Sequence, residues 1–253
     1  MLAKDLLVKD VASVDTRKDI LDALFAMFTS RQYVLPVFDK SKFVGTVSIS
    51  NYAKVLRDFM DRKPESIHVS EIMDEKPITV SPTTDISYFV DKLSERGVHG
   101  VPVLSGHDLI GMIRREDVLK HFMHLLKGKF KVMDVMSHQV STGSIHDTVE
   151  NVAKRLITGD ERRIVIMNYK KIEGVLCIKD LANILLAEKA DLSTMSVKDI
   201  LIPNTLTVRK SDDVTKAVEI MLDWQVTGVP VVGEELEGIV KDKDIIQRLR
   251  FIL

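Results

Sequence analysis

At four positions in the chain an Asp or Asn, which can accept hydrogen bonds, stands three residues after another polar or charged residue or a cysteine, and in three of the four that earlier side chain could meet a phosphate. An Asp or Asn at the start of a helix can accept hydrogen bonds from two adjacent hydroxyl groups of a sugar, which favours binding once the cleft is dry. A hydroxyl or a cation beside the same helix N-terminus could bind phosphate. The four pairs are Ser48 with Asn51, Arg114 with Asp117, Cys177 with Asp180, and Lys241 with Asp244.

The first member of each pair differs in what it could bind. Only Ser48 offers a hydroxyl, whereas Arg114 offers a bidentate fork and Lys241 a point charge. Cys177 could do neither well. The alternative for every acceptor is a helix N-cap, which needs no ligand and accounts for the residue type by itself.

The pairs recur because the chain contains an internal repeat. A glycine stands six residues before each acceptor, and these glycines are spaced by 66, 63 and 64 residues. An apolar triplet recurs with a similar spacing. Its four copies are Leu35-Pro36-Val37, Val101-Pro102-Val103, Ile164-Val165-Ile166 and Val229-Pro230-Val231. We name the copies repeats 1 to 4 and assign them to residues 1–57, 67–126, 131–187 and 195–253.

The periodicity within each copy predicts a β-α-β-β-α unit. A short strand is followed by a polar stretch that ends in an acidic residue, which is typical of a helix start. In repeat 2, Ile86, Phe89, Val90 and Leu93 then follow helical spacing with one buried face. Two β-branched strands and a closing helix complete the unit. About 60 residues are marginal alone, so we expect repeat 1 to pair with repeat 2 and repeat 3 with repeat 4. The corresponding halves are roughly 1–121 and 122–253.

Composition excludes several classes of protein. The 36 Lys and Arg residues balance 37 Asp and Glu residues, so no overall basic field would bind nucleic acid or an anionic membrane. With 45% hydrophobic residues the chain can form a core, and its apolar runs are too short to span a bilayer. The single cysteine excludes an internal disulfide. We therefore expect a cytoplasmic protein without membrane or nucleic-acid partners.

The ordered motifs resemble the CBS domain, named for cystathionine β-synthase, over nearly the whole chain. Repeat 2 carries Val69-Ser-Glu-Ile-Met73, Pro77-Ile-Thr-Val80 and Gly97-Val-His-Gly-Val-Pro-Val103 before its glycine motif. Repeat 4 carries a similar set from Val197 to Asp244. The resemblance implies an α/β (α+β) fold in which four CBS repeats pair into two Bateman modules.

The resemblance also implies regulatory adenosine ligands, namely AMP, ADP, ATP or S-adenosylmethionine, in clefts between paired repeats. In repeat 2, His99, Arg114 and Asp117 would converge on phosphate and ribose, while Thr79 and Val101 would flank the base. Tyr33, Arg162 and Thr227 hold the place of His99 in the other repeats, and Tyr33 could stack on adenine. The alternative for His99 and Tyr33 is a solvated turn. The remaining residues implied at ligand sites are Pro102, Ser48, Asn51, Asp180, Thr207, Val229, Lys241 and Asp244.

No motif supports catalysis or a metal centre. His121 and His124 could share a helix face, but no third ligand is apparent, and no phosphate loop or nucleophile elbow is present. We therefore expect a stand-alone sensor that passes ligand binding to an effector protein, with homodimerisation as a weaker expectation. A scaffold subunit with degenerate clefts is the alternative. An enzyme acting on a nucleotide is a third and weaker one.

Overall fold

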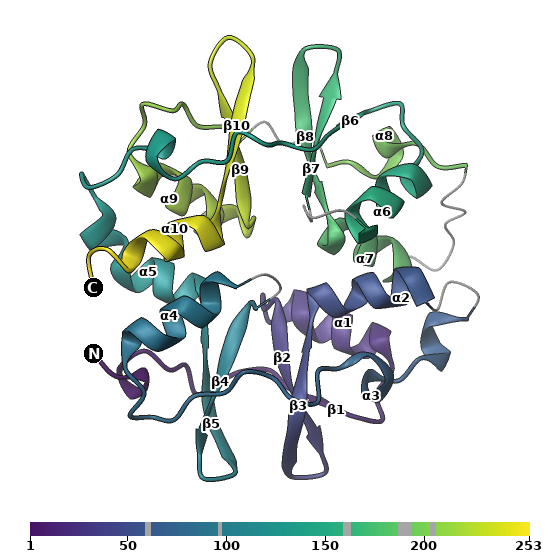
Figure 1. The fold of residues 1–253 in the computed structure, drawn as a ribbon. Helices are drawn as coiled ribbons and strands as arrows, with labels where there is room; N and C mark the ends of the chain where they lie inside the picture. The colour runs from purple at the N-terminus through teal and green to yellow at the C-terminus, as the bar shows by residue number, and fades with distance from the viewer. Residues whose placement is uncertain (59–61, 96–97, 159–162, 187–193, 203–205) are drawn as a thin grey trace.

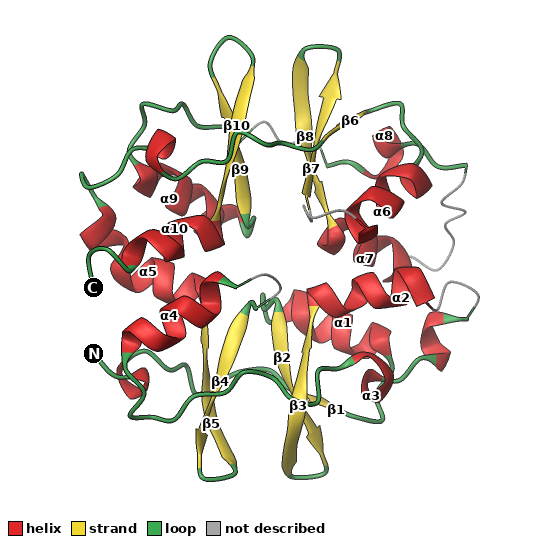
Figure 2. Ribbon diagram, in the orientation of Figure 1, coloured by secondary structure: helices red, strands yellow, loops and turns green. Residues whose placement is uncertain are grey.

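The protein is represented by a computed structural model that describes residues 1–58, 62–95, 98–158, 163–186, 194–202 and 206–253. Helices and strands alternate in four units, which correspond to repeats 1 to 4 (Figures 1 and 2). The described helices include none that is long and apolar enough to cross a membrane. Mixed helices and sheets confirm the predicted α+β fold.

Each repeat contains one antiparallel hairpin, because two β-branched segments flank a tight turn. The hairpins are β2 (Val34–Asp39) with β3 (Lys42–Ser48), β4 (Gly100–Ser105) with β5 (Asp108–Arg114), β7 (Arg163–Asn168) with β8 (Lys171–Cys177), and β9 (Gly228–Val232) with β10 (Leu236–Lys241). The predicted opening strand forms in repeats 1 and 3, as β1 (Val14–Asp15) and β6 (Thr142–Ser144), parallel to its neighbour. In repeats 2 and 4 it is reduced to a single bridge, so the β-α-β-β-α prediction is too regular there.

The first main helix of each repeat begins near the predicted acidic residue. Asp19, Asp85 and Asp213 accept hydrogen bonds from helix amides as N-caps, whereas Asp147 accepts from the amide of Ser144 in the preceding turn. These helices are α1 (Ile20–Thr29), α4 (Ile86–Ser94), α6 (Val149–Thr158) and α9 (Val214–Trp224). The closing helices are α2 (Tyr52–Asp58), α5 (Arg115–Leu126), α7 (Ile178–Leu186) and α10 (Asp242–Leu249). Shorter turns are η1 (Ala3–Asp5), η2 (Ile49–Asn51), η3 (Pro64–Ser66), α3 (Val69–Ile72), η4 (Val132–Asp134) and α8 (Val197–Ile200).

Neighbouring repeats exchange the segments that precede their sheets. Val8, at the start of repeat 1, forms two backbone hydrogen bonds of 2.8 and 2.9 Å with Met112 of repeat 2. In return, Asp74 from the start of repeat 2 forms bonds of 2.8 and 3.0 Å with Thr46 of repeat 1. At the start of repeat 3, Ser137 bonds in the same way to Ile239 of repeat 4. The expected association of repeats 1 and 2, and of repeats 3 and 4, therefore involves reciprocal exchange.

This exchange explains the repeating glycine. A Cβ added at Gly45 would lie 2.3 Å from the carbonyl oxygen of Asp74, and one at Gly238 would lie 2.7 Å from that of Ser137. At Gly174 the nearest atom belongs instead to the Leu201 side chain, at 3.1 Å. In repeats 1 and 4 the motif glycine therefore stands where one backbone passes close to another, whereas Gly174 faces a side chain.

The hydrophobic cores join the repeats in a second way, which the sequence analysis did not predict. One cluster of buried side chains combines repeat 1 with repeat 3, and another combines repeat 2 with repeat 4. Helices α1 and α2 face α6 and α7, while α4 and α5 face α9 and α10, and the hairpins point away from the middle (Figure 1). Each repeat thus contacts one neighbour through exchanged segments and another through its helices.

Candidate functional site

A cavity of about 490 Å³ lies between repeats 2 and 4, near the middle of the molecule. We call it the central cavity. Its walls come from the start of α5, the end of α9 and the first residue of α10, together with Arg31 and Tyr33 of repeat 1. Five sequence-predicted site residues line it, namely Tyr33, His99, Arg114, Asp117 and Thr227. The volume falls within the range of about 300 to 1,000 Å³ that is typical of small-molecule sites.

Arg114 and Asp117 form a bidentate ion pair on the wall of this cavity. The guanidinium Nε and Nη2 donate to the two carboxylate oxygens at 2.8 and 2.9 Å, and the amide of Arg114 donates to the same carboxylate at 3.1 Å. Their side chains are 14% and 16% exposed. The groups predicted to bind phosphate and ribose therefore bind each other here, and Asp117 also caps α5.

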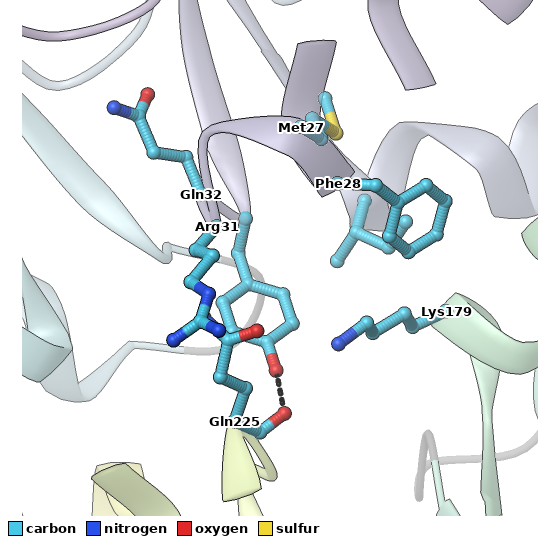
Figure 3. A pocket seen from close by; sticks show the side chains of 8 residues that line it. Met27, Phe28, Arg31, Gln32, Lys179 and Gln225 are labelled. Atoms are coloured by element: carbon cyan, nitrogen blue, oxygen red, sulfur yellow. Dashed lines mark hydrogen bonds between the residues drawn. The ribbon is translucent and has the colours of Figure 1, made fainter. Parts of the chain in front are cut away.

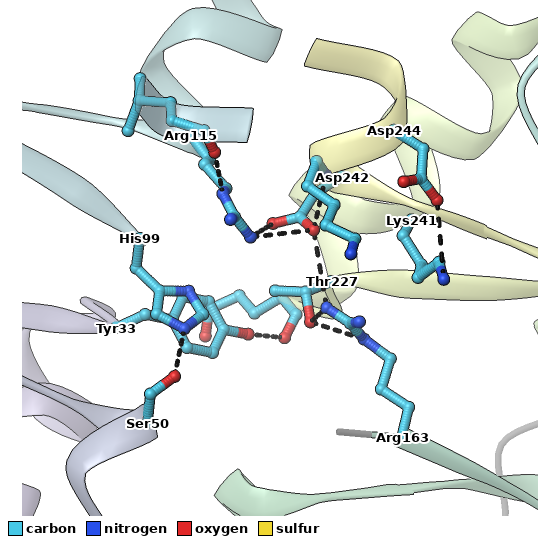
Figure 4. Close-up of polar contacts among 12 residues, drawn as sticks. Tyr33, Ser50, His99, Arg115, Arg163, Thr227, Lys241, Asp242 and Asp244 are labelled. Atoms are coloured by element: carbon cyan, nitrogen blue, oxygen red, sulfur yellow. Dashed lines mark hydrogen bonds and ion pairs between the residues drawn. The ribbon is translucent and has the colours of Figure 1, made fainter. Parts of the chain in front are cut away.

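His99 joins repeat 2 to repeat 1 at the edge of the central cavity (Figure 4). Its Nε2 lies 3.0 Å from the hydroxyl of Ser50, and its ring stacks near that of Tyr33 with a centroid distance of 5.9 Å. The histidine is thus held by partners on another repeat, which differs from the solvated turn that was its alternative. Its ring nevertheless lines the cavity.

A buried polar network connects repeats 2, 3 and 4 (Figure 4). The carboxylate of Asp242 in repeat 4 lies 3.2 Å from Arg115 of repeat 2 and 3.5 Å from Arg163 of repeat 3. Arg163 also donates a 3.0 Å hydrogen bond to the hydroxyl of Thr227. Burial raises the pKa of Asp242, but the charges of Arg115, Arg163 and His99 outweigh it, so this pKa lies below its usual range.

Tyr33 lines both the central cavity and a much smaller pocket of about 20 Å³, whose other lining residues include Phe28, Lys179 and Gln225 (Figure 3). Its hydroxyl donates a hydrogen bond to the carbonyl oxygen of Gln225 in repeat 4, and the Lys179 ammonium lies 5.4 Å from its ring centroid. Burial raises the pKa of Tyr33 above its usual range. The small pocket has room for about one water molecule, so Tyr33 does not face a second ligand-sized space there.

The acceptors of repeats 1 and 3 act as caps. The side-chain oxygen of Asn51 accepts hydrogen bonds from the amide and hydroxyl of Ser48, while its amide donates to the carbonyl oxygen of Ile72. Asp180 accepts from the amide of Cys177 at 2.7 Å, and burial raises the pKa of this carboxyl. The cap alternative therefore accounts for both residues. In repeat 4, Lys241 lies 3.8 Å from Asp244 without lining the central cavity.

The residues predicted to flank an adenine base are not brought to the central cavity. Val101 and Val229 are at most 1% exposed within the core, and Pro102 is buried beside Val101 in β4. Thr79 is exposed and Thr207 is half-buried, each before its own sheet. Arg162 lies outside the described residues. A base in the central cavity would therefore need other neighbours.

Sequence reasoning missed six charged residues that line the cavity, namely Arg31, Arg115, Glu116, Lys120, Asp223 and Asp242. A signal was present in the repeat itself. The fourth residue after the motif glycine is Arg115 in repeat 2 and Asp242 in repeat 4, but Ile49 and Ile178 in repeats 1 and 3. Opposite charges in one pair of repeats and matching isoleucines in the other indicate which repeats face each other.

Metal binding has no support in the described part of the chain. The rings of His121 and His124 lie with centroids 6.5 Å apart, and the described residues include no group of three or more His, Cys, Asp or Glu side chains that could hold a metal ion. His124 instead has its Nδ1 at 2.9 Å from the carbonyl oxygen of His121.

Comparisons with known proteins agree with the repeat. The family model described as the CBS domain matches residues 69–124, 132–187 and 197–250, which together exceed half of the chain. The uncharacterized protein MJ1225 of Methanocaldococcus jannaschii is 21% identical, over 94% of this chain and 95% of its own length. MJ1404 of the same organism is 24% identical, over 72% of this chain but only 43% of that protein.

Solved structures show the same fold. The crystal structure of MJ1225 has a TM-score of 0.86 at 20% identity, and the match covers 98% of this chain and 100% of that chain. An uncharacterized conserved protein from Pyrococcus horikoshii has a TM-score of 0.68 at 14% identity, with the same coverage. Three matched segments and a shared architecture lead to one conclusion: the chain belongs to the CBS-domain family.

Proposed function

We propose that the protein is a non-catalytic sensor that binds an adenosine nucleotide in the central cavity and passes the change to an effector protein. The observation that carries this proposal is the Arg114–Asp117 ion pair on the wall of a ligand-sized space. We further propose that repeat 1 is a diverged fourth CBS repeat and that the exchanged pairs form two Bateman modules. The crystallised relative MJ1225 is described as a candidate archaeal homologue of γ-AMPK, which is consistent with this direction.

A nucleotide would provide new partners for both members of the Arg114–Asp117 ion pair at once. Its phosphate would accept from the guanidinium of Arg114, and its ribose hydroxyls would donate to the carboxylate of Asp117. Phosphate or nucleoside alone would leave one of the two charged groups without its partner, which is costly in a partly buried site. The site therefore favours ligands that carry phosphate and ribose together over ligands that carry only one.

The rest of the cavity suits a purine ring. Helices α5 and α9 and the turn after α9 contribute apolar side chains to its walls, and exposed basic side chains stand at its edge. The apolar residues are Leu119, Met123, Met221, Leu222 and Val226, and the basic residues at the edge are Arg31 and Lys120. Apolar walls with a few placed polar groups are typical of small-molecule sites.

Calorimetric titration of AMP and adenosine tests this assignment. Asp117→Ala should weaken both ligands about tenfold or more, because a hydrogen bond to a charged group contributes roughly 1.5 to 3 kcal/mol. Arg114→Ala should weaken AMP by a similar factor without weakening adenosine, because no guanidinium is then left without its partner when the ribose binds Asp117. Asp180→Ala is the matched control, since it removes a cap in repeat 3 and should leave both affinities unchanged. Equal losses for both ligands in Arg114→Ala, or unchanged affinity in Asp117→Ala, would remove the central cavity from the proposal.

A scaffold role is the second candidate, because repeats 1 and 3 use their acceptors as caps and their shared core is apolar. A thermal-shift panel of AMP, ADP, ATP, S-adenosylmethionine and methylthioadenosine separates the two functions. A sensor at 100 times the dissociation constant gains about 2.7 kcal/mol of apparent stability. No shift with any compound would favour the scaffold, and turnover assays with ATP or AMP would reveal an enzyme.

A further inference from the structure

Glu116 places a second carboxylate beside Arg114 in the central cavity. Its Oε1 lies 3.5 Å from the Arg114 Nε, beyond normal hydrogen-bond distance for this ion pair. This oxygen is buried and accepts no hydrogen bond from the described residues, although the side chain as a whole is 31% exposed. Glu116 therefore faces the site without being held in it as Asp117 is.

Charged groups from several elements surround Glu116 in the central cavity. On its own helix, Asp117 already binds the guanidinium of Arg114 through two hydrogen bonds. From α10, Asp242 is buried between Arg115 and Arg163, and from repeat 1 the phenol of Tyr33 is neutral. The exposed basic side chains of Arg31 and Lys120 stand at the edge of the cavity. Burial raises the pKa of Glu116 to about 7, although Arg114 acts in the opposite direction. One cation thus stands next to two carboxylates at the place where a phosphate would bind.

We propose that Glu116 limits the number of phosphate groups on the ligand, so that the central cavity accepts a nucleoside monophosphate and disfavours di- and triphosphates. This inference rests on the proposed function, because it requires a nucleotide in the cavity. The reason is electrostatic: each added phosphate brings more negative charge to a partly dehydrated space that already holds an unmatched carboxylate. At the exposed edge of the cavity, Asp223 acts in the same direction and Arg31 and Lys120 act against it, whereas Glu116 lies beside Arg114 inside.

A purely structural role for Glu116 makes a different prediction. If its carboxylate only positioned Arg114, replacing it would change the affinity for every nucleotide by the same factor. A charge limit instead changes the ratio between triphosphate and monophosphate. The ratio of the ATP affinity to the AMP affinity is therefore the informative quantity, because a loss of folded protein lowers both affinities by the same factor.

Calorimetric titration of AMP, ADP and ATP against the wild type and Glu116→Gln measures this ratio. At pH 8 the variant should bind ATP about tenfold more tightly relative to AMP than the wild type does, since one removed charge acts mainly on the extra phosphates. At pH 6 the wild type should approach the ratio of the variant, because Glu116 then takes up a proton. The phosphates also titrate near pH 6, but they do so equally for both proteins. Glu219→Gln, on the exposed face of α9, is the matched control and should retain the wild-type ratio.

The outcomes separate this inference from the proposed function. If nucleotides bind but Glu116→Gln leaves the ATP-to-AMP ratio unchanged at pH 8, the charge limit is overturned and the sensor proposal stands. If no nucleotide binds either protein at millimolar concentration, both are overturned. A ratio that changes equally in Glu219→Gln would show a general charge effect and would also overturn the assignment to Glu116.

Discussion

The guanidinium of Arg115 and the carboxylate of Asp242 lie 3.2 Å apart, with both side chains 5% exposed, and they join repeat 2 to repeat 4. At the same motif position, repeats 1 and 3 bury Ile49 and Ile178 in their common core. Turning one half of the molecule around would place each charge opposite an isoleucine. A buried charge without a partner is strongly unfavourable, so this one position permits repeat 1 to face 3 and repeat 2 to face 4, and opposes the alternative.

Replacing the buried pair by the residues of the other half tests that interpretation. Asp242→Ile should lower the free energy of unfolding by about 3 kcal/mol, because it leaves the buried charge of Arg115 uncompensated. Arg115→Ile should lower it by less, because Arg163 remains 3.5 Å from Asp242. The double variant should be more stable than the sum of the two losses predicts, since it recreates an apolar contact. Urea denaturation of the four proteins measures the coupling, and strictly additive losses would contradict the pairing role.

Glu116 should make stability depend on pH in a way that its glutamine variant does not. Its folded pKa of about 7 lies above its unfolded value, so the folded state holds the proton more tightly. The resulting stabilisation is present below pH 4.5 and disappears as pH rises through 7, with a slope of at most about 1.4 kcal/mol per pH unit. Urea denaturation from pH 4.5 to 8 should show this decline in the wild type and a shallower one in Glu116→Gln. Parallel curves for the two proteins would refute the raised pKa.

The motif glycines should differ in their tolerance of alanine. Gly45→Ala places a methyl group against the Asp74 carbonyl and disturbs the two backbone bonds between Thr46 and Asp74, so a loss of about 2 kcal/mol or more is expected. Gly174→Ala is the comparison, because a movable leucine side chain stands opposite it. Its cost should stay below about 1 kcal/mol. Thermal denaturation measures both, and equal losses would mean that backbone crossing does not explain the glycine.

The hydroxyl of Tyr33 should stabilise the contact between repeats 1 and 4. Tyr33→Phe removes its hydrogen bond to the Gln225 carbonyl and should lower the free energy of unfolding by about 1 kcal/mol. Tyr88→Phe is the control, since that side chain is half exposed on α4. If chemical denaturation gives the two variants the same stability, the contact contributes nothing beyond packing.

Local features of the fold could be predicted from sequence, whereas contacts between distant repeats could not. The caps at Asp19, Asp85 and Asp213 and the hairpins follow from residue types within a few positions of each other. The role of Tyr33 depends on Gln225, which is nearly two hundred residues away, so its local motif suggested stacking on a base instead. Which repeats face each other could in principle be predicted from the opposite charges of Arg115 and Asp242. These two residues stand two positions before the acceptors Asp117 and Asp244, outside the ligand-binding pattern of the motif.

The exchange of leading segments also bears on how such a chain can grow. A single copy of the repeat, cut at its own boundaries, would lack the strand-like segment that lies against its glycine and would carry one that belongs to a neighbour. Val8 completes a sheet whose other strands come a hundred residues later, and Asp74 completes the sheet before it. Duplication of one repeat alone would leave an unfilled edge, whereas duplication of two would not. The smallest part of this chain that fills its own sheet edges is therefore two adjacent repeats, not one.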